Sequence, residues 1–224
     1  MRTVSLAAVL VGAMILTAPP AAAGPEACTA LGGVIEAGDI CGVHASDPAY
    51  TMDVTFPLGY PDEQVIIDYL GQTRDGFVRV AQAPDARNLP YEMDVSAQSF
   101  ASAQTRSVVL TLFQSVGGAH PTTWYKSFTF DVSQNRPVTF DMLFAPDTKP
   151  LQEIFPLVQR QLEKDTILAG SISPGDGLDP SHYQNFAVTD DAVIFFFGRG
   201  ELLPSYVGET SVTLPRNEIP PLQL

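Results

Sequence analysis

The chain has 224 residues, and its 25 Asp and Glu against 12 Lys and Arg give a formal net charge of −13 at pH 7. Such an acidic surface argues against partners that are themselves strongly negative, namely nucleic acids and anionic membranes. It favours solubility outside the cell, and it would also favour a cationic protein partner.

The N-terminus has the layout of a secretory signal peptide. Arg2 precedes an apolar run over residues 4–16, and small residues follow up to Ala23. The run of about 13 residues is shorter than the roughly 20 that a membrane-spanning helix needs. We therefore expect residues 1–23 to be removed and residues 24–224 to form a single exported domain, found outside the cell or in the cell wall. An uncleaved N-terminal anchor is the alternative.

Two cysteines, Cys28 and Cys41, follow this leader closely. In an oxidising compartment a lone pair so close in sequence is expected to form a disulfide. Gly32, Gly33 and Gly38 lie between them, so the loop can close without a regular element. No further Cys or His stands nearby at ligand spacing, so a metal site is not expected here.

The middle of the chain predicts one strand, one helix and then three strands. Residues 49–56 alternate as a strand, and residues 61–80 begin with Pro-Asp-Glu and carry apolar side chains at helical spacing. Residues 91–100, 106–114 and 122–132 alternate in turn with short links between them. Three such strands are typical of an antiparallel meander.

The last third predicts a second helix and more strands. Residues 151–162 have the apolar spacing of an amphipathic helix, with a kink or two abutting pieces expected at Pro156. Strands are expected at 185–189, 192–197 and 211–214. The unbroken apolar run over 192–197 is typical of a central strand covered on both faces, by two helices or by a helix and a loop.

Together these patterns predict an α+β fold, with an antiparallel or mixed, β-grasp-like sheet packed against two main helices. The N-terminal part, residues 24–105, would hold the disulfide. The part over residues 106–224 would hold the hairpin, the second helix and the last strands.

Hydrolase motifs are absent from the chain. There is no Gly-x-Ser-x-Gly nucleophile elbow, no Ser-x-x-Lys and no His-Glu-x-x-His. The three histidines show no pair at ligand spacing, and no cofactor or metal is predicted. Residues 170–180 are expected to be a loop, whose Asp176 and Asp179 are interpreted as ordinary turn residues rather than a calcium site.

His120 is the titratable group of greatest interest. It lies in the Gly-Gly-Ala-His-Pro loop between two predicted strands, and Ser115 lies at the other end of that loop. If the hairpin closes between them, Ser115 could serve as a nucleophile and His120 as its general base. Ser205 is a further candidate nucleophile. Ser181 and His182 form a second Ser/His pair, but adjacent residues on a strand or helix face apart. The alternative is that His120 is a structural turn residue.

Several blocks of sequence resemble a known family. They are Asp47-Pro48-Ala49-Tyr50, Tyr60-Pro61-Asp62, Thr73-Arg74-Asp75, the segment from Gly117 to Thr123, Gly177-Leu178-Asp179-Pro180, the segment from Tyr183 to Thr189, that from Val193 to Phe197, and that from Gly200 to Pro204. They resemble the mycobacterial secreted immunogenic proteins of the MPT-sixty-four type, and most closely the member described as a cell-wall esterase. The second half also resembles a domain of lysozyme-sensing anti-sigma factors and of peptidoglycan deacetylases.

The resemblance implies a secreted cell-envelope protein. Its first implied function is weak carboxylic-ester hydrolysis, on a small ester or a lipid. The alternative that it implies is a non-enzymatic extracellular module that binds a cationic host or envelope protein, such as a lysozyme-like partner. A structural cell-wall protein is a third reading. We expect a monomer. The family offers no catalytic motif to transfer, so Ser115, His120 and Ser205 remain an inference from the residues alone.

Overall fold

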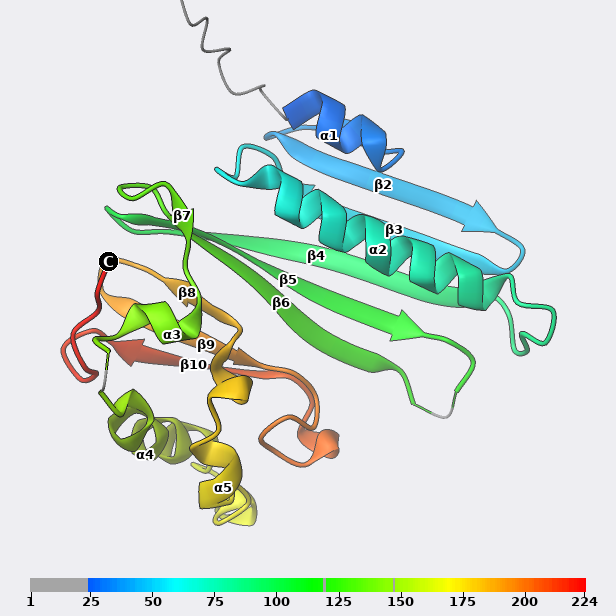
Figure 1. The fold of residues 1–224 in the computed structure, drawn as a ribbon. Coiled ribbons are helices and arrows are strands. Elements are labelled where there is room, and N and C mark those ends of the chain that lie inside the picture. Colours follow the sequence, from blue (N-terminus) through cyan, green and yellow to red (C-terminus); the bar gives the residue numbers. More distant parts are fainter. Residues whose placement is uncertain (1–23, 119, 147) are drawn as a thin grey trace, which may run out of the picture.

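The structure is a computed structural model that describes residues 24–118, 120–146 and 148–224. The leader expected at residues 1–23 lies outside the described residues. The described chain forms two β-sheets with helices on their outer sides (Figure 1). A seven-stranded sheet has its strands in the order β1 to β7, and a three-stranded sheet has the order β10-β9-β8. This mixed architecture confirms the predicted α+β class.

The larger sheet joins two antiparallel meanders, β1 to β3 and β4 to β7, by one crossover. Its strands are β1 (Val34–Glu36), β2 (Ile40–Asp47), β3 (Tyr50–Pro57), β4 (Tyr91–Ala101), β5 (Thr105–Ser115), β6 (Thr122–Asp131) and β7 (Arg136–Pro137). Neighbours pair antiparallel except β3 and β4, which are parallel. A parallel pair needs a long crossover, and α2 (Glu63–Ala81) provides it. The predicted helix and the three-stranded meander are thereby confirmed.

The helix α2 covers one face of the larger sheet (Figure 1). Its buried residues Ile66, Leu70 and Phe77 pack in one core with inward side chains of the strands. Those strand residues recur at every second position, as the alternating pattern predicted. They include Tyr91, Met93 and Val95 of β4 and Val108, Leu110 and Leu112 of β5.

A disulfide fixes the N-terminal helix α1 (Gly24–Ala30) to the sheet. Cys28 and Cys41 are bonded, with their Cα atoms 5.5 Å apart, and both are fully buried. Gly33 lies against the bridge, because a Cβ atom there would stand 2.7 Å from the Sγ of Cys41. The pairing agrees with the sequence prediction. The segment between the cysteines contains β1, and β2 begins at Ile40, two strands that the sequence patterns did not predict.

The smaller sheet belongs to a second core. Its strands are β8 (Phe186–Val188), β9 (Ala192–Phe197) and β10 (Thr210–Pro215). The helices on its outer side are α3 (Phe140–Leu143), α4 (Pro150–Leu162) and α5 (Pro174–Gly177), with 3₁₀ turns η1 (Thr166–Leu168), η2 (Pro180–Tyr183) and η3 (Ser205–Val207). The helix α4 continues as one element through Pro156 rather than as two pieces. The segment expected to be a loop at 170–180 instead contains α5 and the start of η2.

The central position of β9 is confirmed, but its covering is not as predicted. Val193, Phe195 and Phe197 face the helices, whereas Phe196 faces the larger sheet and packs with Val109. The second cover of β9 is therefore a sheet, not a helix or a loop. The unbroken apolar run of β9 thus packs with one face against the helices and with the other against the larger sheet.

Hydroxyl groups also join the two sheets. Thr129 Oγ1 donates to the carbonyl of Phe186 at 3.2 Å, and Thr105 Oγ1 donates to that of Val188 at 3.4 Å. Both threonines are buried, so these bonds satisfy polar atoms that would otherwise lose water without replacement.

Candidate functional site

Two of the predicted site residues, Ser115 and His120, lie at the tip of the β5–β6 hairpin. Ser115 ends β5 and is half-buried, while His120 lies in the loop before β6 and is exposed. Gly117 adopts a positive φ of 72°, and a Cβ atom there would stand 2.6 Å from the carbonyl oxygen of Arg87. This loop therefore needs glycine for its backbone conformation and for its close contact with the segment after α2.

Ser115 and His120 sit at opposite ends of this loop. Within residues 24–118, 120–146 and 148–224, no hydrogen bond joins the Ser115 hydroxyl to the His120 imidazole. The hairpin closes as predicted, with Gln114 opposite Thr122. The side-chain pairing of Ser115 and His120 remains a hypothesis.

Arg199 connects the His120 loop to the loop of Ser205. Its Nε donates to the carbonyl of Ser205 at 2.8 Å, and its Nη1 donates to the carbonyl of Pro121 at 3.4 Å. Its backbone N–H also donates to the carbonyl of Thr123 at 3.3 Å. One guanidinium thus holds the residue next to His120 and the backbone of Ser205. Ser205 is exposed at the start of η3.

Glu201 connects the same loop to η2. One carboxylate oxygen accepts a hydrogen bond from the backbone N–H of Gly198 at 2.6 Å, and the other lies 3.7 Å from Nδ1 of His182. About a quarter of each side chain is exposed, 26% for Glu201 and 23% for His182. Burial raises the pKa of Glu201, while the Gly198 N–H and His182 oppose that rise. Sequence reasoning missed this pair because the two residues are far apart in the chain.

We use the name loop junction for the surface formed by residues 116–118 and 120–121, residues 198–208 and η2. Arg199 joins the backbone next to His120 to the backbone of Ser205, and Glu201 of the same loop lies beside His182. A histidine beside a carboxylate, here His182 beside Glu201, is the arrangement that orients a general base in nucleophilic catalysis, and a serine hydroxyl is the usual nucleophile. The loop junction therefore holds the residue types that acyl transfer needs.

Asp179 starts η2 and fixes its position. Its Oδ1 accepts a hydrogen bond from the backbone N–H of Ser181 at 2.8 Å. Hydrogen bonds from the backbone and side chain of Ser181, together with the charge of His182, lower the pKa of Asp179. Asp179 thus acts as the N-cap of η2, a turn role like that predicted from the sequence. No group of three or more His, Cys, Asp or Glu in the part of the chain that the structure describes could hold a metal ion.

An apolar cavity lies beside the start of η2, on its α3 and α4 side. Its volume is about 490 Å³. Its lining residues come from α3, the segment before α4, the first turn of α4, and the chain on either side of Asp179. They are Phe140, Asp141, Phe144, Ala145, Pro146, Thr148, Lys149, Pro150, Leu151, Gln152, Leu178 and Pro180.

The second half of the chain matches a described class of domain. Residues 141–217 match the family model "Protein of unknown function (DUF3298)". The crystal structure of a DUF3298 family protein from Pseudomonas aeruginosa resembles the fold with a TM-score of 0.57 at 13% identity, and the match covers 82% of this chain and 94% of that one. The α+β fold of this class is thus shared.

Closer relatives identify the family. An esterase of Mycobacterium tuberculosis, Rv3036c, is 52% identical over the full length of both chains. The immunogenic protein MPT64 of the same species is 45% identical over 82% of each chain. The chain belongs to the family of these mycobacterial proteins, as its sequence blocks predicted. The peptidoglycan-N-acetylmuramic acid deacetylase PdaC of Bacillus subtilis is 24% identical over 117 residues. That match covers 51% of this chain and 25% of the deacetylase.

The length and apolar character of the helices also bear on whether they could cross a membrane. Among the residues that the structure describes, none of the helices has the length and apolar character needed to cross a membrane.

Proposed function

We propose that this protein is an exported envelope protein that hydrolyses carboxylic esters. The observation that carries the proposal is the 52% identity, over the whole chain, to a protein named an esterase. The signal-peptide layout of the first 23 residues supports export, with the mature chain starting at Gly24. Intact mass of the exported protein tests that start directly.

The loop junction supplies a mechanism for the proposal. His120 removes the proton from the Ser205 hydroxyl, whose oxygen attacks the ester carbonyl and displaces the alcohol. His120 returns the proton to the departing alcohol, and a water molecule then releases the acid by the same route. Backbone N–H groups of the glycine loop at 117–118 are the candidate donors to the oxyanion. Ser115 is the alternative nucleophile, since it ends the strand that leads into the same loop.

Turnover of p-nitrophenyl acetate by purified protein tests this assignment. A general base contributes about 10²–10⁴-fold, so His120→Ala should remove nearly all activity. Loss with Ser205→Ala or with Ser115→Ala identifies the nucleophile. Ser99→Ala, an exposed serine on β4, is the matched control. If wild type is active and all three variants stay within a factor of two of it, His120, Ser115 and Ser205 do not carry the hydrolysis.

A second candidate function is binding of a cationic protein. The face of the larger sheet that points away from α2 carries exposed carboxylates at neighbouring positions. Asp53 of β3 pairs with Asp94 of β4, and Glu92 and Glu36 lie on the same face. Binding of lysozyme to the purified protein tests this function. The function is supported if the protein has no ester turnover, binds lysozyme, and binds it more weakly when Asp53 and Asp94 are both replaced by Asn.

A further inference from the structure

We propose that the cavity beside α4 binds the hydrocarbon chain of a single-chain acyl ester with an uncharged head. The inference rests on the proposed ester hydrolysis for the class of the ligand. Its volume of about 490 Å³ lies within the range of roughly 300–1,000 Å³ in which proteins bind small molecules.

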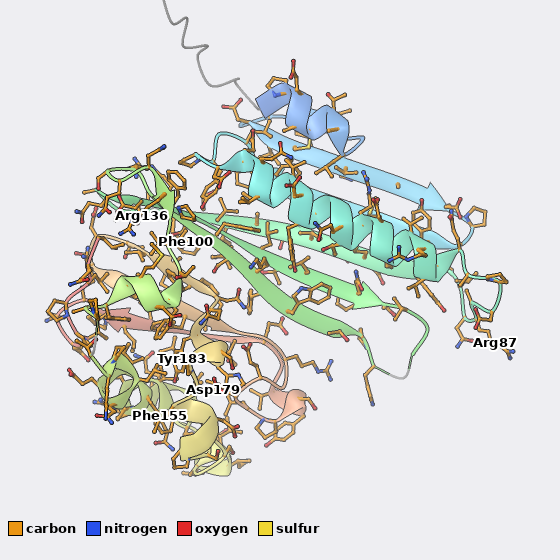
Figure 2. The ribbon with its side chains drawn as sticks, viewed as in Figure 1. Arg87, Phe100, Arg136, Phe155, Asp179 and Tyr183 are labelled. Carbon is orange, nitrogen blue, oxygen red and sulfur yellow. A yellow bond between two sulfur atoms is a disulfide. The ribbon has the colours of Figure 1, made fainter. Side chains whose placement is uncertain are left out.

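The apolar wall of the cavity is held rigidly. Phe140 is 3% exposed, and its ring centroid lies 5.7 Å from that of Phe144 and 5.8 Å from that of Tyr183. Tyr183 is fully buried, and its hydroxyl donates to the carbonyl of Gly177 at 2.8 Å. Figure 2 shows Tyr183, Asp179 and Phe155 on this helical side of the small sheet. Because these rings are fixed by one another, the wall is preformed and need not be ordered by a ligand.

The lining is apolar on most of its area, with polar side chains from α3 and the start of α4. Phe140, Phe144, Leu151 and Leu178 supply the apolar part, together with the prolines. This composition suits a hydrocarbon chain, whose transfer from water is favourable in proportion to the apolar area covered.

The polar lining residues carry both donors and acceptors. They are Asp141, Thr148, Lys149 and Gln152. An ammonium and a carboxylate together match the hydroxyl and ester oxygens of a neutral head such as glycerol. Asp141 and Lys149 together leave the lining without net charge, so a free fatty-acid carboxylate would lose its water there without a net electrostatic gain. The chemistry therefore favours an acyl ester over the corresponding acid.

The cavity adjoins the loop junction through η2. Pro180 lines the cavity, and His182 in the same turn contacts Glu201 of the Ser205 loop. A 3₁₀ turn advances by only about 2 Å per residue, so the two features are close neighbours along this element. The cavity and the loop junction thus share the 3₁₀ turn η2.

Equilibrium dialysis of radiolabelled monolauroylglycerol, below the concentration at which it forms micelles, tests the site without requiring turnover. Leu178→Trp should fill the cavity and weaken binding at least tenfold. Leu178 is 43% exposed, so the change should spare the fold. Leu89→Trp, at a residue 42% exposed on the loop after α2, is the matched control and should bind as wild type does. Gln152→Trp, at an exposed position of α4, is a second way to close the cavity.

The outcomes separate the two proposals. Binding that falls in Leu178→Trp and Gln152→Trp but not in Leu89→Trp, with laurate binding more weakly than its glycerol ester, supports the cavity. Absence of binding by wild type, or equal binding by all variants, overturns it. Binding without any ester turnover would refute hydrolysis and leave the cavity standing. Ester turnover together with absence of binding by wild type, or with equal binding by all variants, would refute the cavity and leave hydrolysis standing.

Discussion

Replacing Phe196 by Ala tests the contact between the two sheets. Phe196 is 4% exposed, and its ring centroid lies 5.3 Å from that of Tyr125 and 5.9 Å from that of Phe100. Truncation of a buried Phe to Ala costs about 3–5 kcal/mol, from lost burial and from the cavity left behind. With a urea m-value of about 2 kcal/mol/M, the unfolding midpoint should fall by about 1.5–2.5 M. Phe196→Asp would add an unpaired buried carboxylate and should cost more.

Urea unfolding followed by two probes gives the measurement. Far-UV circular dichroism reports both sheets. Fluorescence of Trp124, the single tryptophan, reports the larger sheet, because its indole N–H donates to the Tyr69 hydroxyl of α2 at 2.9 Å. In Phe196→Ala both midpoints should fall, and the two curves should separate because the smaller sheet has lost its support.

Tyr206→Ala is the control for this experiment, since that ring is 70% exposed and its loss should change stability by no more than about 0.5 kcal/mol. A Phe196→Ala protein whose stability lies within about 1 kcal/mol of wild type would show that Phe196 does not hold the sheets together.

Three further predictions concern other parts of the fold. Replacing Cys28 and Cys41 by Ser should lower the free energy of unfolding by about 3 kcal/mol, and a loss below 1 kcal/mol in urea unfolding would contradict this. Side-chain hydrogen bonds to Glu36 and Asp53 raise the pKa of His44 above its ordinary value of 6.5. The protonated His44 therefore stabilises the fold fully below pH 6.5, and this stabilisation is lost as the pH rises through the pKa of the folded state. An NMR titration of His44 that gives 6.5 or less would disprove it. Gly177→Ala should destabilise the protein by about 1–3 kcal/mol, because its Cβ would collide with the ring of Phe155, whereas Gly175→Ala should be tolerated since its nearest contact is 3.5 Å away. Equal thermal melting of the two variants would argue against that contact.

The candidate site was predictable only in part. His120 and Ser205 stood out because of their residue types and their glycine-containing loops, but nothing in local spacing indicated that Arg199 joins those loops. The sequence gives His182 no evident partner because it adjoins Ser181, and Glu201, which it contacts, lies on a distant loop. Contacts of this kind depend on how β9 and η2 are placed, which no short sequence pattern encodes.

The sequence by itself determined the elements with a clear period. Alternation over β4, β5 and β6 and helical spacing over α2 and α4 indicate which side chains face inward, since these periods follow from backbone geometry alone. It did not reveal β1 and β2, whose short strands take their place from pairing with β3 and from the disulfide. Only the tertiary structure decided that Phe196 packs on a second sheet and that three separate loops meet at one surface. An apolar face shows that something must cover it, but the covering partner is selected by the whole chain's packing.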